Sequence, residues 1–353
     1  MITSLIIAVL FVITVGLAFI EDKLQERDKI IILAGYVVFM VFMATTKSVE
    51  NTADASLYEY FFYKNDDLLI QLTTEPTYIY LSRMVLALGG TIGVMFFIYA
   101  IISIPAKIKV LYSITPYIFT ALMIYIPVYF ELHDMVQIRA AAAAMFLIAS
   151  LIPMSKGDYW LSVALITGGI LFHYSAAVYL PFILIGNRKL NVTTRVIIAF
   201  LFPICFAMYL LKTDLISLIP EMSSTIGYKL KEYKEKAETI DNTGGYKIYT
   251  NLYYIAKVIM LYLCLYFYDY LSEKHRMAPL CITLFSVGVL FYPAMYTVPV
   301  IAGRISDLFG LVDCIIFTFL LYLIEPKYWA RIAIAIVGLY MLVYNMFFSE
   351  YFI

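Results

Sequence analysis

Long apolar stretches recur along this chain and leave little room for any fold other than a bundle of membrane-spanning helices. A helix needs about 20 apolar residues to cross roughly 30 Å of hydrocarbon. Stretches of that order fall at 3–20, 30–46, 78–104, 110–130, 136–153, 195–211, 251–270, 279–299, 305–324 and 332–349. Residues 158–187 are too long for one crossing and are interrupted at His173, so we interpret them as two short spans. The pattern predicts an all-α polytopic membrane protein, one integral domain over residues 1–353 with about twelve transmembrane helices.

Composition agrees with this class and excludes others. Charged residues make up 14% of the chain, whereas soluble domains have about a quarter. The formal net charge is zero, which gives no polybasic surface for nucleic acid. The four cysteines lie inside apolar segments without CxxC spacing, so we interpret them as small buried residues. Residues 1–20 lack a basic leading region and a cleavage site, and we interpret them as a first span.

Basic residues favour the cytoplasmic ends of spans. They gather in alternate connections, at Lys23, Arg27, Lys29, Lys107, Lys109, Lys156, Arg188, Lys189, Arg195, Lys274, Arg276, Lys327 and Arg331. We therefore expect these connections inside, and both termini, an outer loop at 47–77 and a large outer loop with an interfacial helix at 212–250 outside. The cytoplasmic connections hold no GxxxxGK[ST] or GxGxxG motif. Any chemistry is then expected on the outer face, without direct use of a nucleotide.

Arg139 opens an apolar run that continues with five alanines, 140–144. An arginine within a span costs roughly 2.5–3.5 kcal/mol at mid-bilayer and is retained where it faces a cavity, a partner or an anion. The alanines let a neighbouring helix approach closely. Glu131 or Asp134 could hold the arginine in an ion pair. Alternatively, the guanidinium group receives a phosphate in bidentate geometry, which arginine does better than lysine.

His173 and Glu75 are candidates for proton transfer. A histidine at a helix break is either a hydrogen-bonded cap or a group that accepts a proton or binds a phosphate. Glu75 precedes Pro76, which is typical of a helix start, but its carboxylate is also a candidate base. The remaining candidates for the proton acceptor on the outer side are Asp54, Glu131 and His133.

Aromatic side chains near these polar groups are candidates for glycan binding. Tyr58 lies four residues after Asp54, so the two share one face of a helix. The pair is either an N-cap on an interfacial helix or a carboxylate beside a platform for a sugar. Tyr292 and Tyr296, in a stretch rich in Pro and Tyr, and His133 complete the predicted glycan contacts.

Two further arginines interrupt apolar stretches. Arg83 either extends to the membrane surface or joins an anion site. Arg304 either pairs with Asp307, three residues on, or joins Arg139 at one anion site. The three histidines lie on separate segments, and neither DxD nor HExxH is present, so we predict no metal site.

Taken in order, these residues resemble the EpsG-like branch of the Wzy-type polysaccharide polymerases over roughly residues 40–310. The matching features are Asp54-x-x-x-Tyr58, Glu75-Pro76, Ile138-Arg139 with its alanine run, His173-x-Ser175-Ala176, and Arg304 four to five residues before an aromatic. Ala140 replaces the usual glutamine after the arginine, and Leu308-Phe309 replaces a Tyr-Phe pair. These departures bear on the exact roles of the residues, not on the family.

The resemblance implies a GT-C-like membrane glycosyltransferase of bacterial surface glycan assembly. Such an enzyme transfers the growing glycan from undecaprenyl pyrophosphate to the non-reducing end of a new lipid-linked repeat unit, on the outer face of the inner membrane. We expect inversion, no metal and no cofactor. In this interpretation Arg139, Arg304 and Arg83 bind the pyrophosphate. The implied partners are the lipid-linked oligosaccharide, the bilayer, a chain-length regulator and a flippase.

Two alternatives belong to other classes. An O-antigen ligase resembles these polymerases and also works at an outer-face site. A polysaccharide or lipid transporter, which is not an enzyme, would show internal repeats or paired broken helices. No convincing repeat is visible, and the charged residues are predicted to cluster outward instead of spreading through the membrane.

Overall fold

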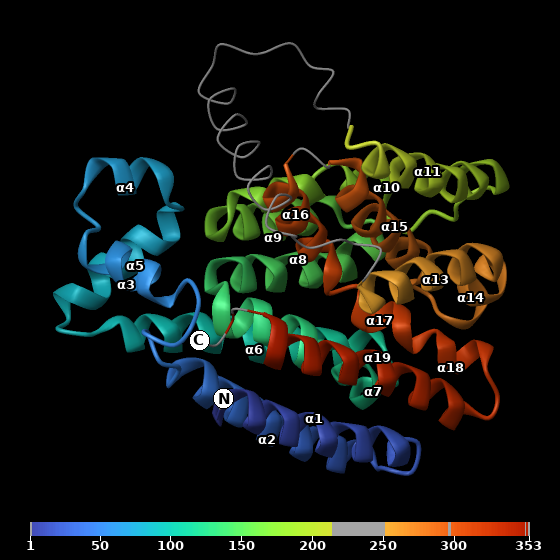
Figure 1. Ribbon diagram of the computed structural model, residues 1–353, viewed down its shortest axis with the longest axis horizontal. Helices are drawn as coiled ribbons and strands as arrows, with labels where there is room; N and C mark the ends of the chain where they lie inside the picture. Colours follow the sequence, from blue (N-terminus) through green and yellow to red (C-terminus); the bar gives the residue numbers. More distant parts are fainter. Residues whose placement is uncertain (1, 214–250, 296–297, 350, 352–353) are drawn as a thin grey trace. The chain divides into compact units, whose positions relative to one another are not determined.

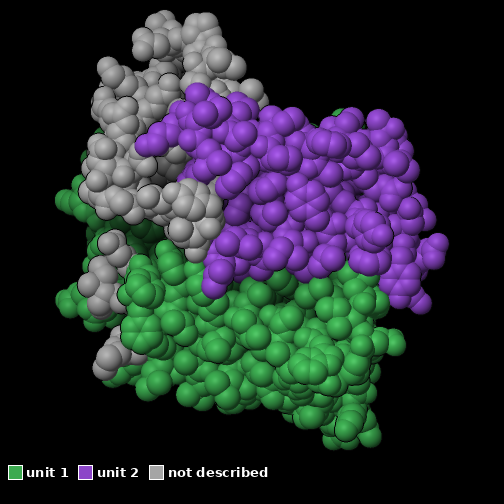
Figure 2. Space-filling view, turned by 45° about the vertical axis from the view of Figure 1, so that its right-hand side comes forward, with its two compact units in different colours: residues 1–186, 317–353 green, residues 187–316 purple. Residues whose placement is uncertain are grey.

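The computed structural model describes residues 2–213, 251–295, 298–349 and 351, and every regular element in these ranges is a helix (Figure 1). The chain divides into two compact units: unit 1, residues 1–186 with 317–353, and unit 2, residues 187–316 (Figure 2). The all-helical class predicted from the apolar stretches is confirmed. The loop predicted at 212–250 falls almost wholly outside the described residues.

Unit 1 contains most of the helices. Those before residue 125 are α1 (Ile2–Ile20), α2 (Glu26–Thr45), α3 (Ala55–Tyr63), α4 (Leu68–Thr73), α5 (Pro76–Ala87), α6 (Ile92–Ile114) and α7 (Ile118–Ile124). The rest are the π-helix η1 (Tyr125–Val136), α8 (Ile138–Lys156), α9 (Tyr159–Phe172), the 3₁₀-helix η2 (Tyr174–Tyr179), α10 (Phe182–Ile185), α18 (Leu320–Leu323) and α19 (Lys327–Phe348). The region predicted as an outer loop, 47–77, therefore includes α3 and α4.

Local sequence explains where several of these helices begin. Pro76 occupies the first position of α5, where its missing N–H costs nothing. Asp67 caps α4 by accepting the Leu69 N–H at 2.8 Å, and Asp158 caps α9 by accepting the Leu161 N–H at 3.1 Å. α4 ends at Thr73 and α5 begins at Pro76, so the two helices lie directly before and after the short segment that carries Glu75.

α8 is the most deeply buried of the membrane-length helices, and small residues are the reason. Ala140–Ala144 are at most 8% exposed. A Cβ atom on Gly169 of α9 would lie 3.4 Å from the Ala143 carbonyl oxygen, and one on Gly168 would lie 2.9 Å from the Phe146 ring. The backbones of α8 and α9 thus approach as closely as the alanine run predicts.

The number of long spans is smaller than the sequence suggests. The described residues hold six helices long and apolar enough to cross a membrane, or up to eight if each of two bent pairs is one span, instead of about twelve. Part of the difference comes from apolar helices that are shorter, among them α9 and α15 (Ala278–Ala294). Another part comes from α7 and η1, which are buried inside unit 1. Hydropathy alone does not distinguish a buried helix from a span.

Lys107 is one of the basic residues used to predict the cytoplasmic connections, and its position differs from that prediction. We expect Lys107 in a cytoplasmic connection, yet the Lys107 Nζ lies 2.9 Å from the Asp134 Oδ1 and both side chains are fully buried. Ser103 and Tyr125 donate to the same carboxylate at 2.6 and 2.7 Å. The expectation for Lys107 is wrong because α6 continues to Ile114, which places Lys107 inside a helix and not in a connection.

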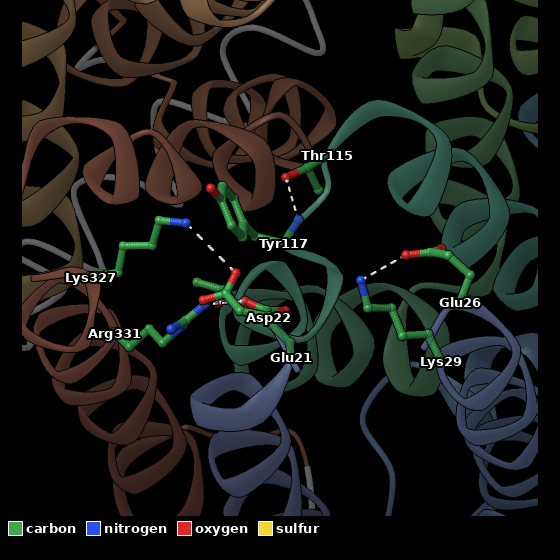
Figure 3. Close-up of polar contacts among 9 residues, drawn as sticks. Glu21, Asp22, Glu26, Lys29, Thr115, Tyr117, Lys327 and Arg331 are labelled. Atoms are coloured by element: carbon green, nitrogen blue, oxygen red, sulfur yellow. Dashed lines mark hydrogen bonds and ion pairs between the residues drawn. The ribbon is translucent and has the colours of Figure 1, made fainter. Parts of the chain in front are cut away.

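A second charge network lies at the end of unit 1 where α1 connects to α2 (Figure 3). Glu21, after α1, accepts the backbone N–H groups of Phe119 and Thr120 at 3.0 and 3.3 Å. Arg331, in the first turns of α19, reaches Glu21 at 3.3 Å and Asp22 at 2.7 Å. The network joins the α1–α2 connection to the starts of α7 and α19.

Unit 2 is described by itself. It contains α11 (Val192–Leu210), α13 (Leu252–Tyr266), α14 (Tyr268–Lys274), α15 and α16 (Pro299–Gly310), and α17 (Asp313–Thr318) lies at its boundary with unit 1. α13 and α14 bend by 84° at a short break. Within the unit, Asp313 is buried and accepts both the Lys257 ammonium at 3.0 Å and the Tyr253 hydroxyl at 2.8 Å.

Candidate active site

Glu75 joins two of the predicted site residues. Its Oε1 lies 2.8 Å from the Nδ1 of His173, and its Oε2 accepts a hydrogen bond from the Nη1 of Arg139. The Glu75 side chain is only 5% exposed, whereas Arg139 and His173 are 17% and 16% exposed. Glu75 at the start of α5, Arg139 at the start of α8 and His173 at the end of α9 therefore form one cluster. Glu75 is the most deeply buried of the three.

The start of α5 aims the Glu75 side chain into this cluster. Glu75 is the N-cap residue, but its side chain makes no capping bond to its own helix. The next contact is made by Thr77, whose hydroxyl donates to the Leu171 carbonyl at 2.7 Å. The last carbonyl groups of a helix lack intrahelical partners, so this bond completes the end of α9. α5 and α9 are thus joined at the position where Glu75 meets His173.

His173 lies between two helices, as its sequence context predicts. Its backbone is extended, with φ −157° and ψ 114°, between the end of α9 and the start of η2. An ionised carboxylate only accepts hydrogen bonds, so the bond to Glu75 requires the proton on Nδ1. In the neutral imidazole this tautomer leaves Nε2 as the proton acceptor. Glu75 therefore holds His173 in an orientation in which Nε2 is free of this contact.

Arg139 is stabilised without any bound ligand. Its guanidinium carbon lies over the rings of Tyr58, Tyr78 and Phe61, at 5.3, 5.8 and 5.9 Å from the ring centroids. Each such contact contributes roughly 0.5–2 kcal/mol, depending on exposure. Together with the ion pair to Glu75, these contacts offset a membrane cost of about 3 kcal/mol. The sequence alternative of an ion pair to Glu131 or Asp134 is wrong, because Glu75 occupies that role.

The cluster combines one ionised carboxylate with an arginine, a histidine and a helix N-terminus. Burial alone would raise the pKa of Glu75, but the hydrogen bond from His173 and the charge of Arg139 outweigh it and hold that pKa below the ordinary value. Arg139 occupies the second position of α8, at the positive end of the helix dipole, where a cation is unfavourable by about 0.3–1 kcal/mol. A single carboxylate thus faces two basic side chains and a helix N-terminus.

An aromatic shell fixes these positions. The Tyr78 hydroxyl donates to the Tyr58 carbonyl at 2.6 Å, which ties α5 to α3. The ring of Tyr99 on α6 contacts Tyr78 at 6.1 Å and Phe172 at 5.7 Å between centroids. Tyr58 is 4% exposed and stacks beneath Arg139, so its ring face is not available to a sugar in this structure. Its contact is with the arginine instead of the predicted glycan.

Glu131 and His133 lie on η1 and are not part of the cluster around Glu75. Glu131 is buried and accepts a hydrogen bond from Asn345 at 2.7 Å. His133 is fully buried against the ring of Tyr129, and neither of its ring nitrogens has a hydrogen-bond partner in the described part of the chain. Their placement offers no surface for a glycan and no contact with Arg139. The predictions of a catalytic Glu131 and a glycan-binding His133 gain no support here.

Asp54 and Arg83 also lie outside the cluster contacts. Asp54 is exposed and precedes α3 in a left-handed conformation, with φ 60°, and its side chain makes no capping bond. Arg83 donates to the Asn65 carbonyl at 3.2 Å and lies 3.7 Å from the Asp66 carboxylate. Arg83 therefore binds the α3–α4 connection, which neither of the two sequence alternatives anticipates.

The other predicted site residues belong to unit 2. Arg304 is exposed on α16 and makes no ion pair with Asp307 within the described ranges. Tyr292 is half-buried, with its ring 6.4 Å from that of Tyr254. Tyr296 lies outside the described residues.

Several contributors to the cluster escape prediction from sequence. Tyr78, Phe61 and Tyr99 are three of the 32 tyrosines and 25 phenylalanines of the chain, and composition gives no reason to select them. Tyr78 does carry one local signal, because it follows Glu75 on the first turn of the same helix.

Comparison with known proteins adds one match. The model of the EpsG family matches residues 30–352, nearly the whole chain. No curated protein and no solved structure matches the chain.

Proposed function

This chain belongs to the EpsG family of Wzy-like polymerases, and on that premise we propose that it polymerises lipid-linked oligosaccharide repeat units. The growing glycan moves from undecaprenyl pyrophosphate to the non-reducing end of a new repeat unit. The observation that carries the proposal is the Glu75 carboxylate, which binds a base and an anion-binding arginine at once. This reaction needs both functions within one site.

The reaction is a single displacement. The acceptor hydroxyl forms a bond to the anomeric carbon of the growing chain while the bond from that carbon to the pyrophosphate oxygen breaks. The hydroxyl proton passes to Nε2 of His173, and the bonding electrons leave with the pyrophosphate. Glu75 stabilises the imidazolium that results, because its pKa keeps it ionised. Inversion at the anomeric carbon follows from a single displacement.

Arg139 is assigned to the leaving pyrophosphate. Charge develops on that group as the glycosidic bond breaks, and preorganised donors facing the developing charge are commonly the largest catalytic contribution. The N-terminus of α8 adds its unpaired N–H groups at the same place. Arg304 belongs to unit 2, and a role in binding the pyrophosphate is proposed for it from the family pattern alone. With these cations available, the mechanism is proposed without a metal.

The distribution of charge within unit 1 supports an outward-facing site. Figure 1 shows the N-terminus and α3–α5 at one end of the unit, and the α1–α2 and α18–α19 connections at the other. The second end carries Lys23, Arg27, Lys327 and Arg331, which favours the cytoplasm. The Glu75 cluster lies at the start of α5, so we place it on the outer face of a bacterial inner membrane. A flippase and a chain-length regulator are its proposed partners, and GT-C its proposed architecture.

Purified protein mixed with lipid-linked repeat units tests the proposal. The substrate can be extracted from cells that lack this gene, which removes the need to know its sugars. A ladder of products longer than one repeat, with release of undecaprenyl pyrophosphate, is the expected result. Transfer of single repeats to a different acceptor would identify a ligase. Movement of the substrate across vesicles without elongation would identify a transporter, and either result would replace the proposed function.

A further inference from the structure

Lys47 is a buried lysine that none of the reaction steps above uses. It follows α2 by two residues and is only 9% exposed. Its ammonium group donates to the Met135 carbonyl oxygen at 2.6 Å and lies 4.3 Å above the centroid of the Phe96 ring. Burial lowers the pKa of Lys47 to about 7, and the charges of Asp134 and Asp54 oppose that change only in part. Such a costly group is usually kept for a function.

The carbonyl that Lys47 binds lies just before the break between η1 and α8, which precedes Arg139. η1 ends at Val136, Gln137 has the non-helical ψ of 65°, and α8 begins at Ile138. The last carbonyl groups of η1 have no partner within the helix, so an external donor is required. Lys47 supplies that donor four residues before Arg139.

The same break between η1 and α8 is also held by contacts from α6. Ser103 donates to the Asp134 carboxylate at 2.6 Å and also to the Ala141 carbonyl of α8 at 3.2 Å. Lys107 donates to both oxygens of Asp134, at 2.9 and 3.0 Å. Residues 134–141 are thus fixed by buried polar contacts from α6 and from the segment after α2.

We infer that Lys47 is a positioning residue that holds the break between η1 and α8 and so directs Arg139 toward Glu75 and the pyrophosphate. The inference rests on the proposed function of Arg139. Arginine has a long flexible side chain, and its direction depends on where the first turn of α8 begins. A displacement of about 1 Å at a reacting group can cost on the order of 10²-fold in rate. Lys47 needs no contact with substrate to have such an effect.

A double-mutant cycle on the full-length protein tests this inference. Elongation of extracted lipid-linked repeat units is measured for Lys47→Met, Arg139→Lys and the combination, each corrected for folded protein by size-exclusion chromatography. We expect Lys47→Met to slow elongation about tenfold in the wild-type background. In the Arg139→Lys background it should slow elongation less than about threefold, because residues that act together are non-additive. The cycle is repeated with Lys47→Gln, so that misfolding of one variant does not leave the question open.

Arg331→Met is the matched control, because it breaks a buried ion pair at the other end of unit 1. Its effect should be the same in both backgrounds. If Lys47→Met also has equal effects in both backgrounds, Lys47 does not act through Arg139 and the inference is wrong. If Arg139→Lys elongates at the normal rate, the proposed role of Arg139 in the reaction is wrong. That result differs from equal effects of Lys47→Met in both backgrounds, which would overturn only the role of Lys47.

Discussion

Glu75 and His173 are 98 residues apart in the sequence, and the carboxylate of one lies 2.8 Å from the imidazole Nδ1 of the other. The contact gives the histidine a fixed tautomer and an ionised neighbour. Because the same carboxylate binds Arg139, a change at Glu75 should disturb both the proposed base and the proposed anion site.

Glu75→Gln should therefore lower elongation through its effects on both His173 and Arg139. The amide keeps the size of the side chain but removes the charge that binds both partners. We expect a loss of about 10²-fold or more in turnover and a destabilisation of about 1–3 kcal/mol. Elongation rates and thermal unfolding in detergent measure the two effects separately. Near-normal turnover in this variant would mean that Glu75 is only a helix-start residue.

The stability contributed by Glu75 should depend on pH. Its pKa in the folded protein lies below the ordinary 4.5, so its contribution is fully present above pH 4.5 and is lost as the pH falls through the lower value. The wild type should unfold at a higher temperature than Glu75→Gln near neutral pH. That difference should shrink as the pH falls below about 4.5. A difference that stays constant down to acid pH would show that Glu75 is not held ionised by its neighbours.

Arg139→Lys keeps the charge but loses the planar, two-pronged geometry. We expect elongation to fall by roughly 10²–10³-fold, as for loss of a donor at a developing charge. Arg304→Lys is expected to lose most activity as well. Arg83→Lys is the comparison, since Arg83 is bound to the Asn65 carbonyl and to Asp66, and it should cost much less. Equal activity for all three variants would remove the guanidinium requirement.

The orientation can be tested by cysteine labelling. In a background with the four native cysteines replaced, Ser56→Cys should react with an impermeant reagent from outside. Lys23→Cys should react only after the membrane is permeabilised. Both side chains are exposed, so burial does not confuse the comparison. The reverse pattern would place the Glu75 cluster on the cytoplasmic face and exclude the proposed reaction.

Much of the site was predictable from sequence because its residues break local rules. An arginine at the start of an apolar run, a histidine that interrupts one and a carboxylate before a proline each stand out without a structure. The sequence does not reveal their grouping, because Glu75 is 64 residues from Arg139 and 98 from His173. An ion pair to the nearer Glu131 or Asp134 looked equally reasonable.

The topology was harder to predict for a related reason. Hydropathy treats α7 and η1 as it treats a lipid-facing span, although every residue of both is buried. The distribution of basic residues likewise assigns Lys107 to a connection at the membrane surface. Its ion pair with Asp134 instead allows the side chain to be buried within unit 1. Lys47 is the clearest omission, because its significance depends on a single carbonyl group 88 residues away.

The most direct test of the account is His173→Ala, with turnover and binding measured separately. If His173 is the base that Glu75 orients, the purified variant should form no ladder from lipid-linked repeat units. It should still bind them with nearly wild-type affinity, because the arginines hold the pyrophosphate; a loss in turnover alone indicates a transition-state role. A variant that binds the repeat unit weakly but elongates it at the normal maximal rate would contradict the account. It would make His173 a phosphate ligand and require a different proton acceptor.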